Sequence, residues 1–421
     1  MSLSNKAEIN PELVSLFSGL KTAVGNGVAK LTEASKDTNF SILAMILLVA
    51  LFIGLFIYYF KSSRLFETRY NIQRIARENT IAQSEYDTKN GGRVGLRSYL
   101  QTLVQSGVPD TQLVLTNFYV STVNATGLFF PAVDGVVNPE AARMAVKAGA
   151  RGFVFDLWPD LSSGAQFAPS VQVVESGSLW RRISLNSQPF VSILKVLIQE
   201  ALEIQERPGH EDPVFLYLRF RGKPRASTFA ATANALRAVL EQYRLDPTFN
   251  NRRGQQRLFS MPITSLFKKV VIASNVLAEG NPLSDYINVG PMDGIPLEYT
   301  ASHAKGFSDN DRAVAIRNIK QNLTWVAPFS EDPAAEANMW DVATNQAVGV
   351  HFCSMNFWNA NDKLKEYMSP KMFGKQSFSI KPVPLRYIVE ILPNPKYPQD
   401  PKWGTGATAG TPTQPPAIQL P

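Results

Sequence analysis

Cysteine is almost absent from this sequence, and histidine is scarce. Cys353 is the only cysteine, so no disulfide can form within the chain, and a reducing compartment is favoured. It lies in an apolar run, which predicts a buried, unreactive thiol. Of the three histidines, His210 lies in a loop-like stretch, His303 in a polar segment and His351 inside an expected strand. An imidazole within a strand is typical of a hydrogen-bonded core residue, so we expect His351 to be structural.

Two further absences exclude whole classes of protein. No glycine-rich phosphate-binding loop follows any expected strand, which argues against a nucleotide-binding Rossmann fold. The net charge is +7, yet there is neither a long block of lysine and arginine nor zinc-finger spacing. We therefore expect no nucleic-acid partner. A mildly basic surface fits an anionic protein partner or a lipid surface better.

The longest uncharged run, FSILAMILLVALFIGLFIYYF, covers residues 40–60. As a helix it would be about 30 Å long, which matches the apolar core of a bilayer. Tyr58 and Tyr59 stand at one end, where interfacial aromatic residues are common. We predict a single transmembrane helix over 40–60. The excess of arginine and lysine just after it predicts that the C-terminal part lies on the cytosolic side.

The segments around this run differ in composition. Residues 1–39 predict an amphipathic helix that begins at Asn10-Pro11-Glu12 and carries one apolar stripe: Leu13, Phe17, Leu20, Val24, Val28 and Leu31. Residues 61–110 predict a basic helical stalk or linker. Residues 396–421 are rich in proline, threonine and glycine and cannot bury enough apolar surface to fold alone. We expect the first and last of these segments to be docking arms for other structural proteins.

Between residues 111 and 395, apolar runs alternate with helical patterns. Runs without a polar face, typical of strands covered on both sides, occur at 113–120, 152–157, 214–220, 269–274, 323–327 and 350–357. Asn138-Pro139-Glu140 has the cap, proline and early acid of a helix start. Repeated strand–helix units over about 280 residues predict an α/β fold with a (β/α)8 TIM barrel.

The second of these strands ends in an acid, Asp156, at the end where α/β barrels carry their chemistry. A buried carboxylate without a partner is costly. We therefore predict that Asp156 pairs with Arg219 or with another cation at the barrel mouth.

Six stretches, in order along roughly 112–390, carry a family resemblance: NFYVSTVNATGLF, AVKAGARGFVFDLW, PVFLYLR, MPITSLFKKVVIASN, MWDVATNQAVGVHFCSMNFWN and FGKQSFSIKPVPLR. Together they resemble the catalytic X and Y halves of eukaryotic-type phosphoinositide-specific phospholipase C. The resemblance implies a TIM barrel of the PLC-like phosphodiesterase type. In that family two histidines move protons, and a calcium ion held by Asn, Asp and two Glu neutralises the phosphate.

This sequence departs from the family at most of those positions. Of the metal cage it keeps Asn124 and Asp156, whereas the positions of both histidines, both glutamates and a substrate-binding residue carry other side chains: Val123, Gly177, Val154, Arg219 and Trp325. Valine cannot transfer a proton, and two oxygen ligands are too few for calcium. The resemblance thus implies a degenerate pseudoenzyme with no cofactor and no metal.

Two hypotheses of function follow. In the first, the chain is a membrane-anchored, catalytically inactive scaffold, for example a minor capsid protein that links the inner membrane of a large DNA virus to its shell. In a weaker form of it, Arg219, Arg221, Lys223 and Arg225 bind an anionic lipid headgroup. In the second, the chain is a phosphoric diester hydrolase acting on glycerophospholipids through a rewired site, with a base such as Glu175.

Overall fold

The structure is a computed structural model. It describes residues 22, 26, 44–60, 93–124, 126–129, 136–159, 169–171, 174–175, 181–182, 186–205, 209–222, 224–250, 256–277, 279–291, 297–300, 308–327, 342–357 and 362–388. The chain divides into two units, Met1–Tyr387 and Ile388–Pro421, and the elements below belong to the first. Most of the predicted N-terminal helix and stalk and the whole predicted tail lie outside the described residues.

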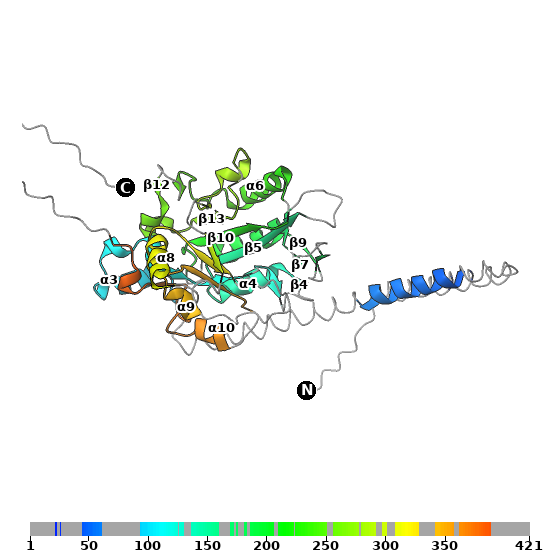
Figure 1. The fold of residues 1–421 in the computed structure, drawn as a ribbon, viewed down its shortest axis with the longest axis horizontal. Helices are drawn as coiled ribbons and strands as arrows, with labels where there is room; N and C mark the ends of the chain where they lie inside the picture. Colours follow the sequence, from blue (N-terminus) through cyan, green and yellow to red (C-terminus); the bar gives the residue numbers. More distant parts are fainter. Residues whose placement is uncertain are drawn as a thin grey trace, which may run out of the picture. The chain divides into compact units, whose positions relative to one another are not determined.

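The main sheet is curled and mostly parallel (Figure 1). Its parallel strands run in the order β13 (Val270–Ser274), β10 (Val214–Phe220), β5 (Gly152–Pro159), β2 (Thr122–Val123), β16 (Phe352–Met355), β15 (Trp325–Ala327) and β14 (Glu298–Thr300). Val289 adds a parallel bridge to Ala273 beyond β13. β6 (Pro169–Val171) and β9 (Gln188–Pro189) extend the sheet from the end of β5 in antiparallel fashion. The described pairings thus form a curled half-barrel, which agrees with part of the predicted (β/α)8 barrel.

The remaining strands form short pairs: β1 (Phe118–Val120) with β17 (Phe378–Ile380), β3 (Leu128–Phe129) with β4 (Val136–Val137), β7 (Val174–Glu175) with β8 (Arg181–Arg182), and β11 (Phe249–Asn250) with β12 (Gln256–Arg257). The prediction of one strand over 113–120 was therefore wrong in extent. Only 118–120 is extended, and it pairs antiparallel with β17 rather than entering the parallel sheet. Two short helical turns precede it because Asn117 binds the backbone of Gln112 and Tyr387 through its side chain.

The helices of the first unit are α3 (Leu96–Gln105), α4 (Pro139–Lys147), α5 (Phe190–Ile198), α6 (Ala226–Leu240), α8 (Asp309–Gln321), α9 (Val342–Gln346) and α10 (Asp362–Tyr367). α4 begins as predicted, because the Asn138 side chain accepts a hydrogen bond from the Glu140 N–H. α3 falls within the predicted stalk, but it buries Leu96, Leu100 and Leu103 in the same apolar cluster as Phe215 of β10. That part of the predicted stalk packs with the sheet.

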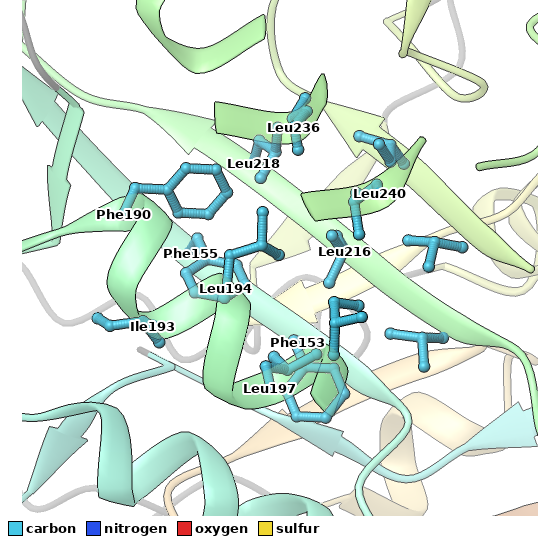
Figure 2. Close-up of a cluster of buried hydrophobic side chains, with 14 of the residues drawn as sticks. Phe153, Phe155, Phe190, Ile193, Leu194, Leu197, Leu216, Leu218, Leu236 and Leu240 are labelled. Carbon is cyan, nitrogen blue, oxygen red and sulfur yellow. The ribbon is translucent and has the colours of Figure 1, made fainter. Parts of the chain in front are cut away.

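Successive side chains of β5 and β10 point to opposite faces of the sheet, so they fall in two separate apolar clusters. The outward side chains of β5 and β10, including Phe153, Phe155, Leu216 and Leu218, pack against α5 and α6 (Figure 2). The inward side chains meet across the curled sheet instead. The ring of Tyr217 lies 5.2 Å from that of Trp325, although three strands separate β10 from β15 in the sheet order. This contact is the direct sign that the sheet curls around an interior.

A separate described helix covers residues 44–60, within the predicted membrane span. Its large apolar side chains are exposed, for example Phe56 and Tyr58. Among the described residues, no helix is long and apolar enough to cross a membrane, so the predicted span is not found there.

Cys353 lies on β16 and is buried, as predicted. Burial raises the pKa of its thiol far above the ordinary value. A thiol held in its protonated form is a poor nucleophile, so the structure gives Cys353 a packing role.

Candidate polar site at the carboxyl ends of the strands

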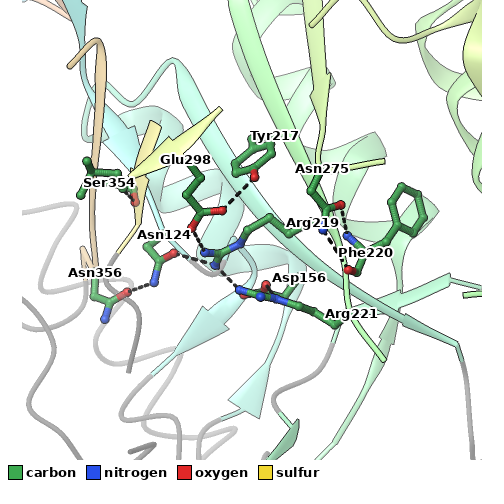
Figure 3. A network of polar contacts seen from close by, with 11 residues as sticks. Asn124, Asp156, Tyr217, Arg219, Phe220, Arg221, Asn275, Glu298, Ser354 and Asn356 are labelled. Carbon is green, nitrogen blue, oxygen red and sulfur yellow. Dashed lines mark hydrogen bonds and ion pairs between the residues drawn. The ribbon is translucent and has the colours of Figure 1, made fainter. Parts of the chain in front are cut away.

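Polar side chains gather at the carboxyl end of β10 (Figure 3). They come from β5 and β10, from the residues just after β2 and β16, and from the first residue of β14. The alternation that points Phe215 and Tyr217 inward continues to Arg219, so its guanidinium enters the interior at the carboxyl end of β10. Arg219 and Asp156 are partners in the parallel register of β10 and β5. Only 3% of the Arg219 side chain is exposed, which makes it a buried cation.

Three oxygens from three parts of the sheet surround the Arg219 guanidinium. Nη2 donates to Asp156 Oδ2 at 2.8 Å and to Asn124 Oδ1 at 3.2 Å, and Nη1 donates to Glu298 Oε1 at 2.9 Å. Asp156 comes from β5, Asn124 follows β2, and Glu298 begins β14. The predicted pairing of Asp156 with Arg219 is therefore present in the structure.

Each acid of this network has a second donor. Arg221 Nε donates to Asp156 Oδ1 at 2.8 Å, and the Tyr217 hydroxyl donates to Glu298 Oε2 at 2.8 Å. Burial opposes ionisation of Asp156, but the two guanidinium groups outweigh it and hold the pKa of that carboxyl below its usual value. The two acids also raise the pKa of Arg219 despite its burial. At neutral pH Asp156 is therefore a carboxylate and Arg219 a charged guanidinium.

Asn124 extends the network to the next strand, because its Nδ2 donates to Asn356 Oδ1 at 3.3 Å just after β16. Arg219 Nε is buried and has no hydrogen-bond partner among the described residues. The polar groups thus form a continuous chain across the end of the sheet, with the guanidinium of Arg219 at its centre.

The other predicted positions lie elsewhere. Val123 is fully buried in the apolar cluster between the sheet and its helices, and Val154 is fully buried in the inner cluster below Asp156. Trp325 is also fully buried and stacks on Phe352 at 4.2 Å, so it fills the interior. Gly177 lies outside the described residues, as do Lys223 and the side chain of Glu175. Arg225 is exposed at the start of α6.

The described histidines are not part of this network. His351 precedes β16 and lies at the amino end of the parallel strands, where Nε2 is 3.0 Å from Thr116 O and Nδ1 accepts from Thr324 N at 3.3 Å. His210 lies in the turn before β10. His303 is outside the described residues. The prediction of a structural His351 is confirmed by these two contacts and its full burial.

His351 predicts an acid-dependent loss of stability. Burial and the nearby Lys381 lower its pKa well below the ordinary 6.5, so the folded state holds it neutral while the unfolded state protonates it. The stability that this group supports is present above pH 6.5 and falls as pH drops below it, by up to about 1.4 kcal/mol per pH unit. Urea unfolding of the wild type and of His351→Gln from pH 7.5 to 5 checks this. The free energy of unfolding should fall more steeply with decreasing pH in the wild type than in His351→Gln. Equal slopes would contradict a buried, neutral His351.

Glu298 and Tyr217 are members of the network that sequence reasoning did not find. The stretch around Glu298 has no long apolar run, and β14 is only three residues long. Tyr217 is indistinguishable in the sequence from the buried residues around it. The only indication for Tyr217 is its position two residues before Arg219, which places both side chains on the same face of β10. No comparable indication marks Glu298.

With this geometry established, the class of fold can be stated: the chain has a PLC-like α/β fold. The structure of PLC21 from S. officinalis matches it with a TM-score of 0.51 and 14% identity, over 67% of this chain and 38% of that chain. PLC21 from L. pealei gives 0.49 and 14%, over 67% of this chain and 39% of that chain. A calcium-dependent phosphoinositol-specific phospholipase C from Pseudomonas sp matches with a TM-score of 0.41 and 11% identity, over 64% of this chain and 96% of that chain.

These likenesses concern the fold alone, because the identities are low. This chain spans less than half the length of either PLC21 protein. No family model and no curated protein matches the sequence.

Calcium does not fit the described residues of this site. The oxygens of Asn124, Asp156 and Glu298 that face one another are already bonded to a guanidinium. Calcium needs six to eight oxygen ligands and is repelled by a resident cation. Among the described residues, no group of three or more His, Cys, Asp or Glu could hold a metal ion.

Proposed function

We propose that the chain acts on the phosphodiester group of glycerophospholipids, as a phosphoric diester hydrolase with a rewired site at the carboxyl ends of its parallel strands. The observation that carries the proposal is the buried Arg219 guanidinium, held by Asp156, Asn124 and Glu298 at the end of a PLC-like sheet. That end is where α/β barrels carry their chemistry. Arginine matches the geometry of phosphate and neutralises its charge. Of the two arginines bonded to Asp156, Arg221 is the accessible one, with 30% of its side chain exposed.

The site has no strong base for proton transfer. Arg219 and Arg221 keep Asp156 ionised but make it a poor base, because its pKa is lowered. Glu298 is the other carboxylate, with one arginine partner and 25% of its side chain exposed. General acid–base catalysis by a well-matched group contributes about 10²–10⁴ in rate. We therefore expect slow turnover with Glu298 as the proton acceptor.

The test is hydrolysis of phosphatidylinositol and lysophospholipids by the full chain, with calcium and with a chelator. We expect slow turnover that the chelator leaves unchanged and that Asp156→Ala or Glu298→Gln reduces at least tenfold. Glu211→Ala is the matched control, because this acid lies before β10 at the other end of the sheet. Turnover that survives both site variants would place the activity elsewhere, and no turnover would contradict the proposal.

One observation favours a second candidate, the catalytically inactive scaffold. Val123, at the position of a proton-transferring histidine in the resemblance, is fully buried among apolar side chains. In this alternative the barrel only supports contacts, such as those between a viral inner membrane and a capsid shell, made through residues 1–39, 40–60 and 396–421. Absence of turnover, together with a map of the chain inside a particle touching membrane and neighbouring subunits, would favour it.

A further inference from the structure

The helix over residues 44–60, drawn in blue in Figure 1, stands outside the three apolar clusters of the described chain. Every residue from 49 to 60 is exposed, and the large side chains among them include Leu51, Phe52 and Phe56. A Cβ atom built on Gly54 would meet no other atom within 4 Å. Nothing else in the described part of the chain therefore packs at this point of the helix.

The exposed apolar side chains lie all around the helix rather than on one face. An α-helix turns once in about 3.6 residues, so the run from 49 to 60 faces every direction about three times. A second copy of the chain would cover one face of this helix and leave the others in water. The hydrocarbon core of a bilayer covers all of them, and a helix that is apolar all round is typical of such surroundings.

The composition of the helix also suits lipid. Residues 44–60 carry no charged side chain, and a helix satisfies its own backbone hydrogen-bonding groups, as the hydrocarbon core requires. Tyr58 and Tyr59 lie near its end, and Lys61 and Arg64 follow in the sequence. Tyrosine is common at the bilayer interface, and anionic headgroups attract basic residues. At 1.5 Å per residue the helix is about 25 Å long, somewhat less than the apolar core of about 30 Å.

We propose that the helix over residues 44–60 inserts into the apolar core of a phospholipid bilayer and anchors the chain to the membrane. Insertion removes from water an apolar surface that the described chain leaves uncovered, and this removal is the driving force. The inference rests on this helix alone and is independent of the proposed hydrolase activity. An anchored chain would also be held beside the phospholipids on which that activity acts.

The test is flotation of the full chain after reconstitution from detergent into phosphatidylcholine vesicles. It is done in about 1 M NaCl, where the Debye length is about 3 Å and attraction between surface charges is screened. The wild type should float with the vesicles. Phe52→Lys combined with Phe56→Lys should lose flotation, because each charge opposes insertion into the hydrocarbon core. Both positions are exposed, so urea unfolding of this variant should match that of the wild type.

A matched control places two lysines at exposed valines elsewhere, Val104→Lys on α3 with Val314→Lys on α8. This variant should float like the wild type. Phe52→Trp then tests depth: lipids brominated along their acyl chains should quench the added tryptophan beyond the quenching of the six native ones. A wild type that does not float, flotation that survives the lysine pair in the helix, or no added quenching would overturn the proposal. So would a wild type that stays in water as an oligomer while the lysine pair makes it monomeric, because the helix then binds a second copy.

Discussion

Asp212→Ala is expected to lower the free energy of unfolding by about 3–5 kcal/mol, as happens when one partner of a buried ion pair is removed. The Asp212 and Arg151 side chains are 3% and 2% exposed, and Arg151 Nε lies 3.8 Å from Asp212 Oδ2. Asp212 Oδ1 also accepts from the Leu96 N–H at 2.8 Å, at the first residue of α3. The substitution therefore removes a carboxylate beside the buried Arg151 guanidinium and the acceptor of a buried helix N–H.

Two variants define the result. Asp212→Asn keeps an acceptor for the Leu96 N–H. Burial already raises the pKa of Asp212, which favours its neutral form. The asparagine variant should therefore lose less free energy of unfolding than the alanine variant. Glu211→Ala breaks an ion pair with Arg97 whose side chains are 31% and 60% exposed, and should leave the free energy of unfolding almost unchanged, because exposed ion pairs contribute little to stability. Urea unfolding at pH 7 measures all three. Equal effects of the Asp212 and Glu211 substitutions would show that the buried contact adds nothing.

The strands that the sequence predicted best are those whose environment is uniform. β10 has no polar face because helices cover it on one side and the interior covers it on the other, and its observed bounds match the predicted 214–220. β5 likewise fulfils the prediction at 152–157 and continues to Pro159. Apolar runs of this kind report burial directly, so no knowledge of neighbouring strands was needed.

The polar site was only half predictable. The pairing of Asp156 with Arg219 followed from the free-energy cost of a lone buried acid, since both residues lie toward the carboxyl ends of their strands and are partners in the register of β5 and β10. Glu298 could not be found in that way, because its contact with Arg219 crosses the interior between strands on opposite sides of the curled sheet. That contact depends on the degree of curling, which no local pattern encodes.

Lys381→Met is expected to stabilise the protein by about 2 kcal/mol at pH 7, the scale of the penalty for a buried polar group without a hydrogen bond. Lys381 follows β17 and is fully buried. Within the described residues, its Nζ has no hydrogen-bond partner and lies 5.6 Å from the centre of the Tyr119 ring. Methionine is apolar, similar in length and adaptable, so it can fill the same space without a charge to desolvate.

The pH dependence gives this prediction its sign. Burial lowers the pKa of Lys381 well below 10.5, with Cys353 opposing the shift and Lys320 adding to it. The unfolded chain protonates this lysine below pH 10.5, so the penalty in the wild type grows as pH falls from there and is absent above it. The gain from Lys381→Met should therefore be large at pH 7 and small at pH 10.5, in urea unfolding at both values. Lys371→Met, at an exposed position, should change stability by less than about 0.5 kcal/mol. If Lys381→Met destabilises the protein at pH 7, the amine has a partner whose loss outweighs its burial.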